Sequence, residues 1–335
     1  MQSEILQRFD RNPILVPNDH KWWESKAVFN CAVMYYNNKF HMLYRAVGEY
    51  EKYISRIGYA SSNDGYCFSK RSLSEEPILA PKEDYEKYGI EDPRLVEIDK
   101  QIYLSYVILS TYAYQNPKVS TALATTSDFE NFTRLGIITT RESDNKDVVL
   151  FPEKIKITYN GDEGISSKGK TNYEQGIKYL FLHRPSSWVG PKYGVDRPSI
   201  WLGEGHSLTS FEKHTLLIKP AQQWEALKVG AGPPPIKTKY GWLLIYHGVD
   251  RNRVYRAGAA LLDLADPAKL IGRTKEPILE PKEPYEKKGD IDNVVFPTGA
   301  VVMDSKLFVY YGAADKVCCL ATGDLDYVLD FIVGE

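Results

Sequence analysis

Polar residues recur at one place along this chain, directly before short apolar runs. Asn30 stands in the segment VFNCAV, and Asp92 stands in the segment IEDPRLV. The corresponding residues of three further segments are Asp147 or its neighbour Lys146, Lys228 and Asp292. One such residue taken alone is usually a turn or cap residue. The position shared by all five predicts a single site that contains two or three carboxylates, an amide and two lysines.

A second set of ionisable residues ends the apolar runs that follow. Arg45, Arg184 and His247 occupy this position. An ionic group at the end of a core strand loses its hydration and therefore needs a partner. Salt bridges to the carboxylates would satisfy one or two of these residues. Three cations at one end of the molecule are more typical of an anion site, and arginine suits the planar oxygens of a carboxylate or a phosphate.

This combination of groups is suited to breaking a glycosidic bond. The chain has 24 Tyr and an aromatic fraction of 13%, so flat apolar faces are available to stack on sugar rings. One carboxylic acid beside a bound oxyanion fits transfer of a glycosyl group to phosphate. Two separated carboxylates would instead fit inverting hydrolysis, in which the second carboxylate activates water. The residues alone leave both nucleophiles open.

Short strand-like runs predict that an all-β protein positions these groups. Each run is rich in β-branched and aromatic residues and is bounded by Gly, Asn, Asp or Pro. Polar turns join neighbouring runs into hairpins. No segment has helical periodicity beyond a turn or two. The runs are residues 29–36, 39–47, 56–62, 101–109, 120–127, 177–184, 199–204, 241–249, 256–264, 296–303, 306–314 and 316–324.

The chain contains an internal repeat. Residues 75–99 return as residues 275–304, and a weaker copy spans residues 11–40. The prolines that anchor the three copies, at positions 13, 77 and 277, are 64 and 200 residues apart, and 200 is three steps of about 67. Five such steps account for all 335 residues. The repeat predicts one five-bladed β-propeller catalytic domain over residues 1–335, in which equivalent loops meet at one mouth.

One segment interrupts the repeat. Residues 156–176 are polar and rich in Gly, Ser and Lys, which predicts an extended hairpin or flap inserted into the third blade. Its sequence fits an element of the site and a plain surface insertion equally well.

Composition limits the classes of partner. The 42 Lys and Arg balance 44 Asp and Glu, so a general binder of nucleic acid is excluded. No apolar run is long enough to span a membrane, and the first residues lack the apolar core of a signal peptide. Cys31, Cys67, Cys318 and Cys319 form no metal-binding or disulfide pattern. We therefore expect a cytoplasmic protein with reduced thiols, no cofactor and no metal site, and we leave homo-oligomer formation open.

Seven motifs together resemble glycoside hydrolase family 130, the β-mannoside phosphorylases. They follow the order of the family across nearly the whole chain, and their combination is specific although any one alone would be weak. They are GIEDPRL (89–95), NKDVVLFPEKI (145–155), LHRPS (182–186), VGAGPPPI (229–236), YHGVD (246–250), YRAGAALLDLADP (255–267) and DNVVFPTGAV (292–301).

The resemblance implies a five-bladed propeller that phosphorolyses a β-mannosidic bond with inversion and releases α-mannose 1-phosphate. It implies that Asp92 is the proton donor, acting through the 3-hydroxyl of the sugar. An acid works best with a pKa near the operating pH, so we expect a nearby Asp292 to raise the pKa of Asp92. Phosphate, a co-substrate and not a cofactor, would be held by Arg184, His247, Lys146 and Tyr255. The mannosyl ring would be held by Asn30, Arg45, Arg94, Lys228 and Asp292.

Some choices stay open within the resemblance. The family also contains hydrolases, in which a carboxylate activates a water nucleophile. Glu142, Glu153 and Glu225 lie near the motifs, where one of them could have this role. A non-catalytic carbohydrate-binding propeller would explain the repeat and the aromatic residues but not an acid beside cations. The linkage, β-1,2 or β-1,4, and the acceptor sugar depend on loops such as residues 49–53, 112–118 and 188–193.

Overall fold

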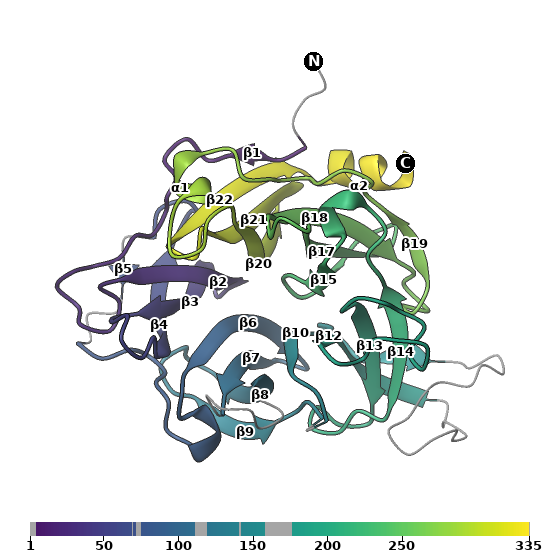
Figure 1. Cartoon of the computed structure of the whole chain (residues 1–335), viewed down its shortest axis with the longest axis horizontal. Helices are drawn as coiled ribbons and strands as arrows, with labels where there is room; N and C mark the ends of the chain where they lie inside the picture. Colours follow the sequence, from purple (N-terminus) through teal and green to yellow (C-terminus); the bar gives the residue numbers. More distant parts are fainter. Residues whose placement is uncertain are drawn as a thin grey trace.

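Five antiparallel β-sheets surround a central axis in the computed structural model (Figure 1). The structure describes residues 5–68, 70–71, 75–110, 119–140, 142–157 and 176–334. Each sheet starts with its innermost strand and runs outward in chain order. The exception is the fifth sheet, which is completed by β1 (Gln7–Arg8) pairing with the last strand, so the N-terminal segment closes the ring. The predicted five-bladed β-propeller is confirmed.

The blades follow one another along the chain. The first contains β2 (Ala27–Tyr36), β3 (Lys39–Val47), β4 (Ser55–Ser62) and β5 (Lys70–Arg71), and the second contains β6 (Ile90–Ile98), β7 (Gln101–Leu109), β8 (Val119–Thr126) and β9 (Thr133–Ile137). The third contains β10 (Asn145–Leu150), β11 (Ile155–Ile157), β12 (Gly176–Pro185), β13 (Ile200–Gly205) and β14 (Lys213–Ile218). The fourth contains β15 (Lys228–Ala231), β16 (Ile236–Lys237), β17 (Trp242–Val249), β18 (Tyr255–Leu262) and β19 (Leu270–Arg273), and the fifth contains β20 (Val295–Met303), β21 (Lys306–Ala313) and β22 (Val317–Asp324).

The core lies between the blades. A hydrophobic cluster fills each of the five junctions between neighbouring sheets. Strands with both faces covered in this way read as nearly continuous apolar runs, which explains why the sequence patterns of the inner strands do not alternate strictly. The stacked junctions hold the inner strands around the axis and fix which residues face the centre.

A buried glutamate supports the loop that leads into four of the five inner strands. In the second blade, Glu86 accepts a hydrogen bond from the Tyr106 hydroxyl at 2.7 Å. Its carboxylate also accepts backbone N–H groups of its own loop, in a capping-box arrangement. The same tyrosine–glutamate bond occurs as Tyr44–Glu24, Tyr246–Glu225 and Tyr311–Glu286. The need for the buried glutamate of this bond explains why residues 75–99 recur as residues 275–304.

Helices are few, but one was missed by the sequence patterns. Two short 3-10 turns, Asp84–Glu86 and Gln223–Glu225, and α1 (Pro284–Lys287) belong to the loops with buried glutamates. The 10-residue α2 (Leu325–Gly334) contradicts the prediction that helices are limited to a turn or two. Val328, Leu329 and Ile332 are buried in the core between the fourth and fifth blades, so tertiary packing stabilises this terminal helix.

The inserted segment can be followed only at its two ends. β11 pairs antiparallel with the start of β12, with Ile157 opposite Gly176. The predicted hairpin at residues 156–176 is therefore consistent with its two ends, but residues 158–175 lie outside the described residues.

Candidate active site

Asn30, Asp92 and Asp147 occupy the same place in three neighbouring blades. Each lies where the innermost strand shifts register against its neighbour, in β2, β6 and β10. Their φ angles are 49°, 47° and 58°. Asn and Asp tolerate this left-handed conformation better than most residues, and a bulge of this kind re-aims a side chain. The bulges explain why these residue types stand directly before the apolar runs.

Lys228 and Asp292 do not share that bulge position, so this part of the repeat prediction is wrong. Lys228 begins β15, where it pairs with Val249, and its Nζ still reaches the Tyr255 hydroxyl at 2.9 Å. Asp292 precedes β20, is exposed, and forms an ion pair with Lys288 at 2.6 Å. The loop that leads into β20 therefore directs Asp292 to a surface lysine.

Arg45 reaches from the first blade to the candidate acid, Asp92, in the second blade. Its Nη1 lies 3.3 Å from Asp92 Oδ1, and its Nη2 donates to Glu91 Oε1 at 2.5 Å. The Asn30 amide donates to the same Asp92 oxygen at 2.8 Å. Ser55 accepts the remaining Arg45 Nε–H at 2.9 Å. All five side chains are buried, so Asp92 is held in a fixed position by donors from the first blade.

Arg94 lies beneath the mouth, between the two carboxylates of the site. Its Nε donates to the Gly232 carbonyl oxygen at 2.5 Å, and its Nη1 donates to the carbonyls of Asp92 and Pro93. Burial lowers the pKa of Arg94, although Asp92 and Asp147 both oppose that effect. The guanidinium therefore joins the second blade to the fourth and adds positive charge to the floor of the site.

A separate cluster joins the third and fourth blades. Arg184 Nε donates to Asp147 Oδ2 at 2.6 Å, and His247 Nε2 lies 3.7 Å from the same oxygen. Burial would raise the pKa of Asp147, but Arg184, His247 and Arg94 together hold it well below its usual value. Gly230 is required here, because a Cβ would stand 2.2 Å from Asp147 Oδ2.

His247 is not one of the cations of this cluster. Burial, the largest cause, and the neighbouring Arg184 and Lys228 lower its pKa to about 3, although Asp147 opposes them. The imidazole is therefore neutral at neutral pH and offers a hydrogen bond instead of a charge. The prediction of three cations at one end is wrong in this respect.

Lys146 and Lys228 supply the remaining positive charge near Arg184. Lys146 Nζ lies 3.5 Å from Glu91 Oε2, which ties it loosely to the Arg45 network. Burial, Arg184 and Lys146 lower the pKa of Lys228 to about 8, although Asp147 opposes them. Lys146 pairs with Arg184 in the β10–β12 ladder, so the two cations are neighbours.

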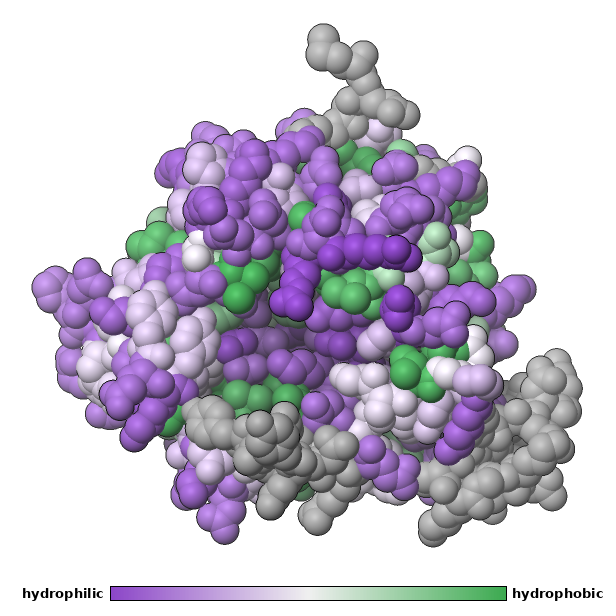
Figure 2. Space-filling model, viewed as in Figure 1, coloured by the Kyte–Doolittle hydropathy of each residue, from purple (hydrophilic) through white to green (hydrophobic). Residues whose placement is uncertain are grey.

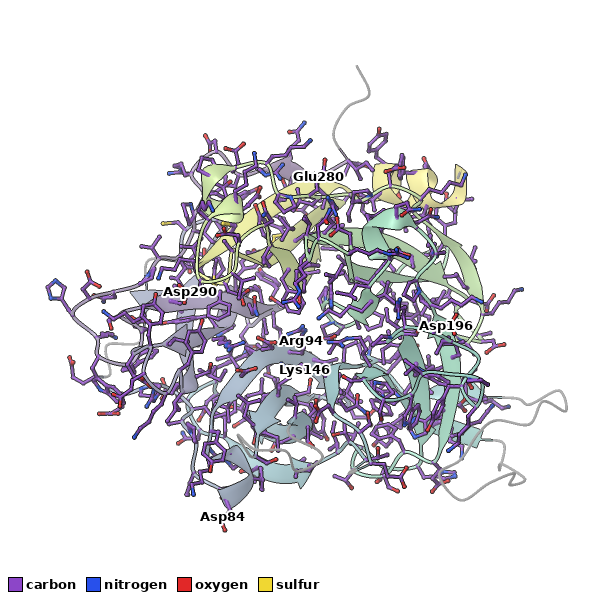
Figure 3. All side chains as sticks on the ribbon, in the orientation of Figure 1. Asp84, Arg94, Lys146, Asp196, Glu280 and Asp290 are labelled. Carbon is purple, nitrogen blue, oxygen red and sulfur yellow. The ribbon has the colours of Figure 1, made fainter. Side chains whose placement is uncertain are left out.

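The mouth is hollow and polar. Figure 2 shows a depression at the centre of one face, with hydrophilic residues on its floor. Figure 3 places Arg94 and Lys146 beside this centre, with Asp290 on the side of the first blade. Among the described residues, three buried polar atoms of the site lack a hydrogen-bond partner: Asn30 Oδ1, Arg94 Nη2 and His247 Nδ1. Buried polar atoms are nearly always paired, so these groups are suited to a polar ligand.

Two residues of the site were missed by the sequence patterns. Glu91 bridges Arg45 and Lys146, and it stands beside Asp92 in the motif GIEDPRL. Asp315 lies in the tight turn between β21 and β22, with φ at 49°. Its closeness to Arg45, Asp92 and Glu91 depends on closure of the ring, and the sequence gives no signal of it beyond a turn carboxylate.

The surroundings of Asp92 and Asp315 shift the pKa values of these two carboxyl groups in opposite directions. Burial would raise the pKa of Asp92, but Arg45, Lys146, Arg94 and the Asn30 hydrogen bond together lower it. For Asp315, burial and the repulsion from Asp92 and Glu91 outweigh Arg45 and raise the pKa to about 7. The expected neighbour Asp292 does not raise the pKa of Asp92, and Asp315 and Glu91 are the neighbouring carboxylates instead.

Asp315 is expected to make folding stability depend on pH near neutrality. Because its pKa is higher in the folded state than in the unfolded state, its stabilising contribution is full below the unfolded pKa. That contribution is lost as pH rises through about 7. Asp315→Asn should therefore flatten the decline of Tm between pH 5 and 8. Asp304→Asn, in another tight turn of the same blade, should keep the wild-type curve, and equal curves for all three proteins would contradict this role.

The described residues contain no group of three or more His, Cys, Asp or Glu side chains arranged to hold a metal ion. Within the same part of the chain, no helix is long and apolar enough to cross a membrane.

Comparison with known proteins agrees with this geometry. The model of glycoside hydrolase family 130, described as β-1,4-mannooligosaccharide phosphorylase, matches residues 3–333. The chain belongs to glycoside hydrolase family 130. A 1,2-β-oligomannan phosphorylase of Thermoanaerobacter sp. (strain X514) is 41% identical, covering 94% of this chain and 96% of that protein. A β-1,2-mannobiose phosphorylase of the same strain is 38% identical, covering 92% and 94%.

The fold of this family-130 chain is also that of a solved relative. The structure of β-1,2-mannobiose phosphorylase from Listeria innocua, in complex with β-1,2-mannobiose, superposes with a TM-score of 0.79 at 32% identity. The superposition covers 98% of this chain and 99% of the Listeria innocua chain.

In this family-130 chain, the three glutamates considered as partners of a water nucleophile do not belong to the site around Asp92 and Arg184. Glu225 is buried in the loop frame and accepts the Tyr246 hydroxyl at 2.6 Å. Glu153 follows β10 and pairs with Lys237 at 2.6 Å. Glu142 is exposed. The partners of the first two lie away from Asp92.

Proposed function

We propose that this protein phosphorolyses β-1,2-linked mannosides with inversion and produces α-mannose 1-phosphate and a shortened sugar. The observation that carries the proposal is the division of the mouth into two unlike halves. Asp92 is fixed among neutral and charged hydrogen-bond donors on the first two blades. Arg184, with Lys146 and Lys228 near it, forms a cationic group on the third and fourth blades.

The first half suits a mannosyl ring beside an acid. Asn30 and Arg45 hold Asp92 in place and leave polar atoms for sugar hydroxyls, and Asn30 Oδ1 has no partner among the described residues. Arg94 supports the floor with one free Nη2. Asp292 is exposed and paired with Lys288, so we do not assign it to the mannosyl ring.

The second half suits a phosphate dianion. Arg184 is oriented by Asp147 and keeps its terminal N–H groups for two oxygens, the geometry that arginine offers to phosphate. Lys146 is held only loosely by Glu91 and can turn to the same anion. His247 contributes a neutral donor, and the Tyr255 hydroxyl, bonded to Lys228, contributes another.

The reaction needs one proton and no general base. A phosphate oxygen bonds to C1 of the mannosyl ring on one face while the glycosidic C1–O bond breaks on the other. The electron pair of that bond stays with the leaving oxygen, which takes the proton that Asp92 supplies through the 3-hydroxyl. The phosphate is already anionic, so the cations only position it and stabilise the developing charge.

Phosphate binding also prepares the acid. In the free protein, Lys146 and Arg94 are among the charges that lower the pKa of Asp92. A bound dianion offsets those charges and so raises the pKa of Asp92 toward the range in which it carries a proton. Asp92 is therefore protonated when phosphate is bound, so the reaction with phosphate is favoured over the reaction with water.

The β-1,2 linkage rests on the named relatives. Three relatives that are 38–41% identical are named for β-1,2-linked mannosides, whereas the description of the family model names β-1,4-mannooligosaccharides. We also place the reaction in the cytoplasm, because Cys31 and Cys319 are buried as thiols, which is usual for a protein of a reducing compartment.

The test is incubation with β-1,2-mannobiose and β-1,4-mannobiose, each with and without phosphate. Phosphorolysis predicts α-mannose 1-phosphate only when phosphate is present, and faster turnover of the β-1,2 isomer. Free mannose at equal rates in both conditions would identify a hydrolase. Binding of mannobiose without turnover would identify a carbohydrate-binding protein.

A further inference from the structure

Two tyrosines, an aspartate and a lysine form a wall at the rim of the mouth. Tyr50 and Tyr53 belong to the loop between β3 and β4, Asp290 belongs to the loop before β20, and Lys316 follows the β21–β22 turn. We call these four residues the rim wall. It joins the first and fifth blades, and Figure 3 shows Asp290 on this side of the central opening.

The rim wall is built from converging hydrogen bonds. The Tyr50 and Tyr53 hydroxyls donate to the two oxygens of Asp290 at 2.9 and 3.0 Å. Lys316 Nζ donates to the same carboxylate at 3.1 Å and to the Tyr50 hydroxyl at 2.5 Å. The two rings are stacked, with centroids 6.1 Å apart and planes 20° apart. Tyr50 is nevertheless 52% exposed, so an aromatic surface faces solvent at the rim.

The loop that carries the tyrosines is held in a defined shape. The Glu49 carboxylate accepts the backbone N–H groups of Lys52 and Ile54 at 2.7 and 3.3 Å. Tyr53 has a φ of 52°, a left-handed conformation that is uncommon for a residue other than glycine. A bulky residue in this conformation indicates that the position of its ring matters.

The rim wall is adjacent to the candidate acid. The Arg45 guanidinium lies 5.9 Å from the centre of the Tyr53 ring, and it also lies 3.3 Å from Asp92. One side chain therefore separates the rim wall from the group that protonates the leaving oxygen.

Inversion fixes the side on which the leaving sugar departs. The nucleophile and the leaving group stand on opposite faces of the anomeric carbon. The cations proposed for phosphate belong to the third and fourth blades, and in a ring of five the first blade stands opposite their junction (Figure 1). The leaving sugar must therefore point toward the first blade, where the rim wall stands.

From this geometry we infer that the rim wall is the subsite for the leaving sugar, with Tyr50 as its stacking surface. This inference rests on the proposed function for the direction of attack. Aromatic rings suit the apolar face of a pyranose, and the Asp290 carboxylate and Lys316 are placed to receive its hydroxyls. The subsite would select the acceptor sugar in the reverse reaction.

The test is run in the synthetic direction, where the two sugars have separate KM values. α-Mannose 1-phosphate is the donor and mannose is the acceptor. Tyr50→Ala is expected to raise the KM for mannose about five- to tenfold and to leave the KM for α-mannose 1-phosphate unchanged. Tyr50→Phe keeps the ring and should restore most of the acceptor affinity. Tyr240→Ala removes a comparably exposed tyrosine, 48% accessible in the β16–β17 turn, and should change neither value.

An unchanged acceptor KM in Tyr50→Ala would overturn the assignment, as would a rise confined to α-mannose 1-phosphate. Calorimetric titration with β-1,2-mannobiose, without phosphate, tests the subsite independently of turnover. If the wild-type protein binds mannobiose but does not phosphorolyse it, the proposed function fails. In that case weaker mannobiose binding by Tyr50→Ala supports the subsite, and equal binding overturns it.

Discussion

Asp92→Asn is expected to lower kcat for phosphorolysis of β-1,2-mannobiose by about three orders of magnitude, the range that general acids supply. The amide is nearly the same size as the carboxylic acid and still accepts a hydrogen bond from the Asn30 amide, which now stands 2.8 Å away. Arg45 keeps Glu91 and Ser55 as partners. The affinity for mannobiose should therefore change only a few fold, so the loss would fall on kcat.

An activated substrate separates proton donation from positioning. An aryl β-mannoside with an acidic phenol leaves without protonation, so Asp92→Asn should lose far less rate on it than on mannobiose. Asp304→Asn is the matched control, because Asp304 also has a positive φ, 50°, but lies in the exposed turn between β20 and β21. Near-normal turnover of mannobiose by Asp92→Asn would refute the assignment of the acid.

The repeat made the architecture predictable, because each blade carries the same local signals. The buried glutamate that closes the loop before an inner strand has to be a carboxylate, so Glu86 and Glu286 leave a trace in the repeated segments. Their tyrosine partners, Tyr106 and Tyr311, lie in the strands that follow, β7 and β21. The same logic located Asn30, Asp92 and Asp147, since a left-handed bulge favours Asn and Asp.

The predictions failed where the repeat itself changes. β15 is only four residues long, so Lys228 stands before the place where other blades have a bulge. Asp292 resembles a bulge residue in sequence but belongs to an exposed loop, where a nearby lysine pairs with it. A single sequence does not reveal which of two adjacent polar residues the loop turns inward.

The charge states of His247 and Asp315 could not be predicted from the sequence, for a different reason. The His247 imidazole is neutral because burial and two cations act on it together, and one of those cations, Arg184, comes from the third blade. Asp315 joins the site only because the fifth blade closes the ring beside the first. Both effects depend on distances between residues that are far apart in the chain.

Arg184→Ala is expected to raise the KM for phosphate about 100-fold, the loss of a charged hydrogen-bonding group worth about 3 kcal/mol. The KM for mannobiose should change little, because the sugar half of the site lies on other blades. Phosphate should raise the Tm of the wild-type protein and fail to raise that of the variant, which tests binding without turnover. Arg184→Lys should recover part of the affinity but not the paired contacts of the guanidinium.

A second substitution separates the binding role of Arg184 from its structural role. Arg184 Nε is the close partner of the buried Asp147 at 2.6 Å, so Arg184→Ala removes that ion pair and leaves His247 3.7 Å away and the weaker effect of Arg94. An uncompensated buried charge costs about 3–5 kcal/mol, so the single variant should also lose Tm.

Arg184→Ala combined with Asp147→Asn removes the stranded charge and should regain Tm while the KM for phosphate stays high. Recovery of phosphate affinity in the double variant would mean that Arg184 acts only by neutralising Asp147. Phosphorolysis by the single variant Arg184→Ala with the wild-type KM for phosphate would place the anion elsewhere in the mouth. Neither Tm nor the KM for phosphate alone distinguishes these cases, so both are measured on the single and the double variant.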